Sequence, residues 1–223
     1  MDKDSFRQKR IKLREEGRDL YTRIMNAGYA KIPVRVLKSK NISRFIKMEE
    51  VSYSVGHIHA TWHRITSGTG VTILPVLHSA KGDRIVMIYK PQPAIGQWSF
   101  ELPSGGIEDG SESETVLKEL LEETGFKSKR IKKLMELAHA PFRLGWVDEV
   151  YVAEKLNFVG RATKENEEFP IRTVILTIPE VKHLLQANKI INAMSVAVLT
   201  TFLYGKELEQ VKDLQKKKKA DFL

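Results

Sequence analysis

Three glutamates stand close together near the middle of the chain, on a segment that follows a glycine-rich loop. They are Glu119, Glu122 and Glu123, and Glu112 lies two helical turns earlier. At about 100° per residue, a helix through this segment would carry these carboxylates along one side. Hard divalent cations prefer carboxylate oxygens, and Mg²⁺ shares its remaining positions with water and substrate phosphates. The segment therefore predicts a site for Mg²⁺ or Mn²⁺, with a solvated acidic helix face as the simpler alternative.

The same helix is expected to dock on a sheet through its other side. The apolar residues expected to face the sheet are Val116, Leu117, Leu120 and Leu121. Ser111 and Glu114 satisfy the S-x-x-E capping pattern, in which each side chain binds an unpaired backbone N–H at the start of a helix. Ser111 is therefore predicted to be the N-cap of this helix and not a metal ligand.

This stretch resembles the Nudix box, G-x5-E-x7-R-E-u-x-E-E-x-G-u, in which u is apolar. Its second half is matched by residues 118–126, Lys-Glu-Leu-Leu-Glu-Glu-Thr-Gly-Phe, with lysine in place of arginine. When the first glycine of the box is placed at Gly105, Ser111 stands where the box has its first glutamate. The spacing from there to Lys118 is one residue short. Glu112 is then the candidate to supply the missing carboxylate.

The resemblance extends to the branch of this family that hydrolyses ADP-ribose and other nucleoside diphosphate sugars. The similar segments are residues 71–77, 85–89, 98–105, 148–153, 173–181 and 190–204. The first two are β-branched runs that predict a hairpin. The resemblance implies an α/β protein with the Nudix fold, an α/β/α sandwich around a mixed sheet, together with a small N-terminal antiparallel β segment.

The resemblance also implies roles in catalysis. The metal ligands it implies are Glu119, Glu123, Glu122, the Gly105 carbonyl and Glu112. Lys118 would orient the carboxylates, as the arginine of the box does. Divalent ions would neutralise the diphosphate and lower the pKa of the attacking water. Glu149 is predicted to be the general base, with Glu122 as the second choice, because packed or buried carboxylates can have a raised pKa.

The predicted substrate-binding positions depart from that branch. Where the branch usually carries a Gln-aromatic-Arg triplet, this chain has Lys90-Pro91-Gln92. Arginine binds phosphate through two parallel hydrogen bonds and glutamine cannot, so either Lys90 or Arg143 would take over the phosphate contact or the substrate is not ADP-ribose. Trp98 is predicted to stack on the base or to be a core or interface residue. Glu101 is predicted to support the metal-bearing helix or to be a surface charge.

These features predict a Mg²⁺-dependent pyrophosphohydrolase. It would cleave the diphosphate of ADP-ribose, or of a related nucleoside diphosphate sugar, to a nucleoside monophosphate and a sugar phosphate. One alternative is a non-catalytic Nudix-fold module that binds a nucleotide or a protein, which the incomplete box favours. Another is an RNA 5′-end pyrophosphohydrolase, which the basic segments favour. The presence of Glu119, Glu122 and Glu123 together favours an enzyme.

Composition narrows the class of protein. With 223 residues, 42% of them hydrophobic, the chain can bury a sizeable core. The absence of cysteine excludes disulfides and thiol nucleophiles. No apolar run predicts a membrane span or a signal peptide, so a cytoplasmic protein without a membrane partner is expected. The net charge of +9 leaves nucleic acid as an open but less favoured partner, since a basic surface attracts a phosphorylated nucleotide equally well.

Four regions are expected along the chain. Residues 1–32 predict a charged helical extension, and residues 33–66 a small β segment. The Nudix hydrolase domain is expected over residues 67–207, followed by a basic tail over residues 208–223. In the sugar-nucleotide branch a segment like the second region mediates dimerisation, so the resemblance implies a homodimer.

Overall fold

The computed structural model describes residues 3–27, 31–107, 110–161 and 170–205. The predicted basic tail, residues 208–223, lies outside this part of the chain. Among the described residues, no helix combines the length and the apolarity that are needed to cross a bilayer. The chain divides into two compact units, one of Met1–Ser39 with Glu49–His63 and the other of Lys40–Met48 with Arg64–Leu223.

The N-terminal elements are a helix and a small sheet. Helix α1 (Lys3–Ala27) covers the charged segment that the sequence predicts to be helical. Three strands follow in the order β1 (Val34–Asn41), β2 (Lys47–Val55) and β3 (Ile58–Thr66), and they form one sheet with β2 in the centre. Short turns join consecutive neighbours, one of them at Gly56 with a φ of 58°, and such turns join antiparallel strands. The predicted small antiparallel segment is therefore present.

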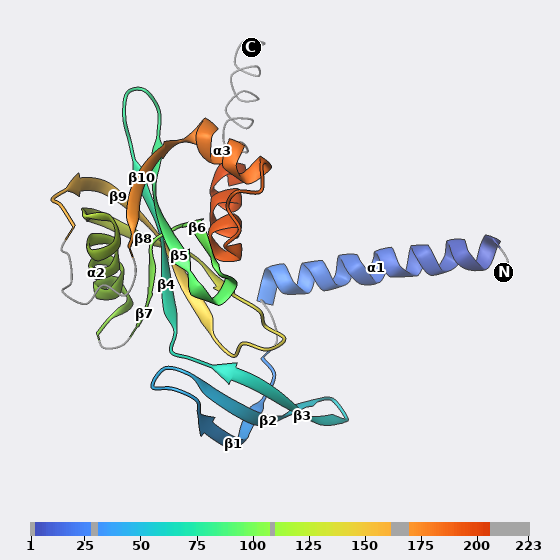
Figure 1. The fold of residues 1–223 in the computed structure, drawn as a ribbon. Helices are drawn as coiled ribbons and strands as arrows, with labels where there is room; N and C mark the ends of the chain where they lie inside the picture. The colour runs from blue at the N-terminus through green and yellow to red at the C-terminus, as the bar shows by residue number, and fades with distance from the viewer. Residues whose placement is uncertain (1–2, 28–30, 108–109, 162–169, 206–223) are drawn as a thin grey trace, which may run out of the picture. The chain divides into compact units, whose positions relative to one another are not determined.

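A seven-stranded mixed sheet forms the centre of the second unit (Figure 1). Its strands are β4 (Gly70–Leu77), β5 (Arg84–Gln92), β6 (Gln97–Glu101), β7 (Ser104–Gly106), β8 (Phe126–Ala138), β9 (Val147–Phe158) and β10 (Arg172–Thr177), with the short 3-10 helix η1 (Pro93–Ile95) before β6. The order is β10-β5-β4-β9-β8, while β6 pairs with β5 and β7 with β4. Strands β4 and β9 run parallel, and the other pairs of this sheet whose register is defined run antiparallel. The hairpin predicted at residues 71–77 and 85–89 is confirmed by β4 and β5.

Helices cover both faces of this sheet. Figure 1 shows α2 (Glu112–Thr124) on one face and α3 (Ile178–Gln186) with a further helical segment at residues 193–205 on the other. Val116 and Leu120 of α2 pack with Val71 and Ile73 of β4. On the opposite face, a second core contains Leu74 and Val76 of β4 together with Val181, Val198 and Leu199. The predicted α/β/α sandwich with a mixed sheet is therefore confirmed.

The ends of α2 are set by local signals that the sequence contains. Ser111 is the N-cap, and it forms the predicted capping box with Glu114: Glu114 N donates to Ser111 Oγ at 3.3 Å, and Ser111 N donates to Glu114 Oε2 at 2.8 Å. Gly125 ends the helix in the left-handed region at a φ of 77°, and its N–H donates to the carbonyl of Leu121. This cap leaves Ser111 in a structural role.

The rotation of α2 about its axis differs from the predicted one. Val116 and Leu120 are fully buried, but Leu117 is 40% exposed, so its predicted place on the docking side is wrong. Glu123 is only 8% exposed and lies on the buried side. Because successive residues are offset by about 100°, a helix that turns Glu123 inward turns Leu117 out of the interface. The buried side of α2 therefore carries Glu123 next to Val116 and Leu120, and the acidic and apolar residues do not lie on opposite sides of the helix.

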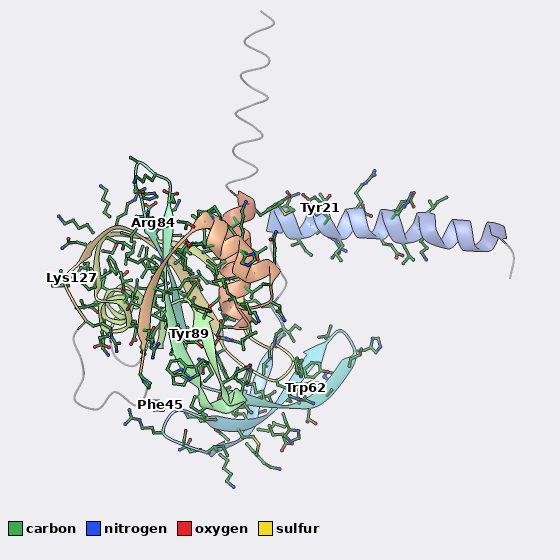
Figure 2. The ribbon with its side chains drawn as sticks, turned by 45° about the horizontal axis from the view of Figure 1, so that its top comes forward. Tyr21, Phe45, Trp62, Arg84, Tyr89 and Lys127 are labelled. Carbon is green, nitrogen blue, oxygen red and sulfur yellow. The ribbon has the colours of Figure 1, made fainter. Side chains whose placement is uncertain are left out.

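The basic run at residues 127–133 lies on β8, an edge strand of the sheet. Lys127, Lys129 and Lys132 are exposed there, and Lys127 lies at the outer margin of the unit in Figure 2. Charged side chains on an edge strand hinder unwanted pairing with strands of other molecules. The run therefore has a structural explanation that requires no nucleic acid.

Candidate active site

The close approach of Glu119 to Gly105 is the central feature of the loop before α2. Gly105 lies on β7 opposite Val71 of β4. A Cβ atom added at Gly105 would lie 2.3 Å from Cδ and 2.6 Å from Oε1 of Glu119. The carboxyl group of Glu119 therefore packs against the backbone of Gly105 in space that a larger residue would fill. Two of the predicted metal ligands are in this way brought together.

Glu123 is a buried carboxylate held by two donors. Lys90 Nζ donates to its Oε1 at 3.1 Å, and the backbone N–H of Ser104 donates to its Oε2 at 2.8 Å. Burial raises the pKa of Glu123 above its usual value, and the nearby carboxylate of Glu101 acts in the same direction. Lys90 and the Ser104 N–H act against this shift of the pKa.

Glu101 is a second buried carboxylate beside the first. It is 3% exposed, and Gln92 Nε2 lies within hydrogen-bonding distance of both of its oxygens, at 2.7 and 2.8 Å. Lys90 Nζ lies 4.0 Å from Glu101 Oε2. Lys90 and Gln92, which the sequence predicts to contact substrate, are thus engaged with acidic side chains of the site itself. Lys90 Nζ thus lies between Glu101 and Glu123 of α2, and the support of this helix by Glu101 stays a prediction.

Glu149 lies at the same end of the sheet as Gly105. Both residues pair with Val71 of β4, from its two sides, so one row of residues crosses β7, β4 and β9. Glu149 is the third residue of strand β9. Its Oε1 accepts a hydrogen bond from Lys133 Nζ at 2.8 Å, and its Oε2 accepts one from the hydroxyl of Tyr151 at 2.7 Å.

These contacts change the expected acid–base behaviour of Glu149. The hydrogen bond from Lys133, and then the one from Tyr151, hold the pKa of Glu149 below its usual value. The predicted rise of the pKa of Glu149 is therefore wrong, because the hydrogen bond from Lys133 outweighs the effect of burial. Burial, followed by the hydrogen bond with Glu149 and the charges of Glu149 and Glu112, raises the pKa of Tyr151 to about 12. Glu112 is thus close enough to act on this group.

The C-terminal end of α2 is bound by residues that the sequence does not mark. Arg161 donates from Nε to the carbonyl of Glu122 at 3.0 Å and from a terminal nitrogen to the carbonyl of Ile171 at 2.6 Å. A cation at this end is favoured by the helix dipole. Glu122 is half-buried, and its Oε2 atom is buried. Lys118, predicted to orient the carboxylates, is exposed on α2.

Trp98 lies on the face of the sheet opposite to the face to which Lys90 points. Its ring stacks on Tyr89 with centroids 5.0 Å apart, and the guanidinium carbon of Arg172 lies 5.7 Å from its centroid. Tyr89 is labelled on β5 in Figure 2. Because side chains alternate along a strand, Tyr89 points away from the face to which Lys90 points. Trp98 is 39% exposed, so the predicted core role does not fit it.

Arg143 lies in the loop between β8 and β9. Its backbone carbonyl accepts a hydrogen bond from Ile65 N at 2.8 Å, and its guanidinium carbon lies 5.8 Å from the ring centroid of Phe142. The side chain is exposed. Because β8 ends and β9 begins at the end of the sheet where β7 lies, this loop belongs to the same end as Gly105.

A buried aspartate next to Glu149 fixes this end of the sheet. Asp148 Oδ1 accepts a hydrogen bond from the backbone of Gly70 at 3.0 Å, and its Oδ2 lies 2.6 Å from His139 Nε2. A Cβ at Gly70 would lie 2.9 Å from Asp148 Oδ1, so glycine is needed for this contact. The bonds hold the starts of β4 and β9 together, beside the residues that carry Gly105 and Glu149.

The donor atoms of the site suit a divalent cation of the Mg²⁺ type. Glu119, Glu123 and the carbonyl of Gly105 offer oxygen only, and Mg²⁺ typically takes one or two carboxylates and completes its shell with water and phosphate. Within the described ranges, no group of three or more His, Cys, Asp or Glu side chains is arranged as a ready metal cage. The arrangement therefore fits an ion that is shared with substrate better than a closed protein site.

Comparison with known proteins gives consistent matches. A family model for the NUDIX domain matches residues 67–190, more than half of the 223-residue chain. The ADP-ribose pyrophosphatase of Bacillus subtilis (strain 168) is 28% identical over 144 residues, which cover 63% of this chain and 74% of that protein. The ADP-sugar pyrophosphatase of Mus musculus is 33% identical over 95 residues, which cover 38% of this chain and 43% of that protein. A crystal structure of an ADP compounds hydrolase shares the fold, with a TM-score of 0.58 and 19% identity over 80% of this chain and 98% of the other.

Proposed function

The chain belongs to the NUDIX domain family and is a hydrolase, and from this premise we propose that in the cytoplasm it cleaves the diphosphate of ADP-ribose or a related nucleoside diphosphate sugar with Mg²⁺ or Mn²⁺. The products would be a nucleoside monophosphate and a sugar phosphate. The observation that carries the proposal is the carboxyl group of Glu119 packed against Gly105. This contact brings a carboxylate to the backbone of β7, one helical turn from the buried Glu123, and these oxygen atoms support a site for a diphosphate-bound ion.

Each residue of the site has a proposed task. Glu119, Glu123 and the Gly105 carbonyl would hold the ion, with Glu122 and Glu112 assisting. The bound ion supplies positive charge that stabilises the negative charge developing on the diphosphate. Glu149 stays the first choice for the general base, because its carboxylate is ionised at neutral pH and can accept the proton of the attacking water. The hydrogen bonds from Lys133 and Tyr151 that lower its pKa make it a weaker base than an ordinary glutamate. Lys133 and Tyr151 hold it in place, and Glu122 is the second choice as base.

Arg143 is our first candidate for the contact with substrate phosphate. Lys90 and Gln92 are engaged with Glu123 and Glu101, whereas the guanidinium of Arg143 is exposed on a loop at the Gly105 end of the sheet. Guanidinium groups bind phosphate through two parallel hydrogen bonds. Trp98, exposed beside Arg172, is the candidate for stacking on the base.

A phosphate-release screen tests the proposal. Purified protein would be offered ADP-ribose, UDP-glucose, GDP-mannose, diadenosine polyphosphates, nucleoside triphosphates and triphosphorylated RNA, with Mg²⁺, Mn²⁺ or EDTA, and phosphatase would release phosphate from the products. We expect turnover of sugar nucleotides that requires the metal. Preferential turnover of RNA would favour the RNA 5′-end alternative, and no turnover of any compound would contradict the proposal.

A non-catalytic nucleotide-binding module is the second candidate. One observation favours it: Ser111, at the place of the first box glutamate, is an N-cap that bonds with Glu114. This module would bind ADP-ribose without cleaving it. Calorimetric titration with ADP-ribose, combined with the screen, separates the two, because binding without turnover supports the module only.

The small sheet of β1, β2 and β3 is our proposed dimer contact. Every residue of β1 is exposed, and Val51 is the only buried hydrophobic residue described in these three strands. The exposed apolar side chains include Val34, Val36, Leu37 and Trp62. Apolar surface of this kind is typical of protein interfaces. We expect light scattering after gel filtration to give twice the mass of one chain, and a monomer at micromolar concentration would contradict the contact.

A further inference from the structure

Lys90 lies between two buried carboxylates. Its Nζ is 3.1 Å from Glu123 Oε1 and 4.0 Å from Glu101 Oε2. The side chain of Lys90 is 17% exposed, and those of Glu101 and Glu123 are 3% and 10% exposed. A lysine in such a place is not a solvated surface charge, and its ammonium is held among groups that are removed from water.

Within the part of the chain that the structure describes, the other donors that bond with these two carboxylates are neutral. Gln92 Nε2 bonds with both oxygens of Glu101, and the Ser104 N–H donates to Glu123. Neutral donors satisfy lone pairs without cancelling charge. Two carboxylates that are buried near one another repel, and burial of an uncompensated charge is strongly unfavourable. The ammonium of Lys90 therefore supplies positive charge that the amide donors cannot.

The fold fixes this ammonium in place. Lys90 is on β5 and pairs with Ser99 of β6, Glu101 ends β6, and Glu123 belongs to α2. The ion pairs thus connect α2 with the sheet. Lys90 also belongs to the segment where the family resemblance implies a Gln-aromatic-Arg triplet whose arginine binds substrate. In this chain the cation of that segment points instead toward Glu101 and Glu123.

We propose that Lys90 is a resident counter-cation: its single positive charge compensates part of the negative charge of Glu101 and Glu123 in the folded protein without any metal ion, and it positions Glu123 one helical turn from Glu119. Lys90 is thus a positioning residue and not a phosphate contact. The positioning of Glu123 for a metal ion rests on the proposed function, whereas the compensation of charge by Lys90 does not.

Thermal unfolding in EDTA tests whether Lys90 compensates the charge of the two carboxylates. The Lys90→Met variant keeps most of the side-chain volume and removes the charge. We expect its Tm in EDTA to fall by on the order of 10 °C, because two buried carboxylates lose their cation. Adding Glu101→Gln to Lys90→Met removes one of the repelling charges and should recover at least about half of this loss. Lys132→Met, a change at an exposed lysine of β8, is the matched control and should leave the Tm unchanged.

The outcomes decide the inference without any substrate. A Tm for Lys90→Met within about 2 °C of the parent, or a double variant no more stable than the single one, would overturn it. Should Lys90→Met fail to fold, a double variant that folds cooperatively supports the inference, and one that also fails contradicts it. Mg²⁺ is then added to Lys90→Met: recovery of the Tm beyond the effect of Mg²⁺ on the parent supports the metal site. A protein that cleaves no compound in the substrate screen can still show the expected loss of Tm in EDTA. The proposed activity and the proposed role of Lys90 can therefore be contradicted independently.

Discussion

Replacing Gly105 by alanine should lower kcat/KM by about 100-fold or more, while the free energy of unfolding changes little. The new Cβ would lie 2.3 Å from Cδ of Glu119, closer than atoms can approach. The obstructed group is the far end of a flexible side chain, so the carboxyl group will move and the backbone will not. Alanine also suits the extended backbone of β7. Steady-state kinetics on the preferred substrate and a thermal melt measure the two effects.

Gly106→Ala provides a matched control for this substitution. Gly106 is the next residue of β7, and a Cβ placed there meets no atom within 4 Å. Its variant should retain the kcat/KM and the Tm of the parent. If alanine at Gly105 leaves turnover unchanged, Glu119 does not need its observed place for catalysis. If both variants lose activity equally, the loop as a whole matters and the contact with Glu119 does not.

The parts of the fold that sequence predicts well are set by local chemistry. The hairpin of β4 and β5 follows from two β-branched runs and from the turn between them, where Gly82 adopts a φ of 101° and donates to Ser79 O at 3.0 Å. The start of α2 follows from the capping box of Ser111 and Glu114. Each signal lies within a few residues of the structure that it determines, so no knowledge of distant contacts is required.

The orientation of α2 depends on distant residues and was therefore not predictable from its own pattern. Glu123 is buried because Lys90, 33 residues away, and Ser104, 19 residues away, bond with its carboxylate. The apolar pattern alone places Leu117 inside and the acids outside, whereas the ion pair turns Glu123 inward and leaves Leu117 exposed. Periodicity carries no information about which charges will find partners across the fold.

The acid–base behaviour of Glu149 is likewise set by a residue that is distant in the sequence. Its pKa depends on Lys133, which lies 16 residues away and reaches it from β8. The pairing of β8 with β9 contains a register shift between Lys133 and Met135, and with this register Lys133 reaches Glu149. A slip of the pairing by one further residue would turn the lysine to the other face of the sheet. The identity of the general base therefore needs the register of the sheet, which the sequence does not provide.

Replacing Glu123 by glutamine should lower kcat by on the order of 1,000-fold, because the site loses a charged oxygen donor that stabilises the ion and the developing charge on phosphate. The Tm should also fall by several degrees. Glutamine has one acceptor oxygen, so its NH₂ group must face either Lys90 Nζ or the Ser104 N–H, and both of these are donors. An unsatisfied buried donor costs about 1–3 kcal/mol of free energy of unfolding. Kinetics must therefore be measured well below the Tm, with circular dichroism to establish that the variant is folded.

Glu114→Gln is the control that separates loss of the site from loss of negative charge on α2. Glu114 lies on the same helix and its carboxylate accepts hydrogen bonds from Ser111 N and Oγ, which a glutamine oxygen also accepts. Both variants remove one charge, but only Glu123→Gln removes it from the buried side beside Gly105. Equal losses of kcat in the two variants would attribute the effect to the overall field of the helix. Full activity of a folded Glu123→Gln protein would exclude this carboxylate from catalysis, and Glu119 and Glu122 would then have to hold the ion.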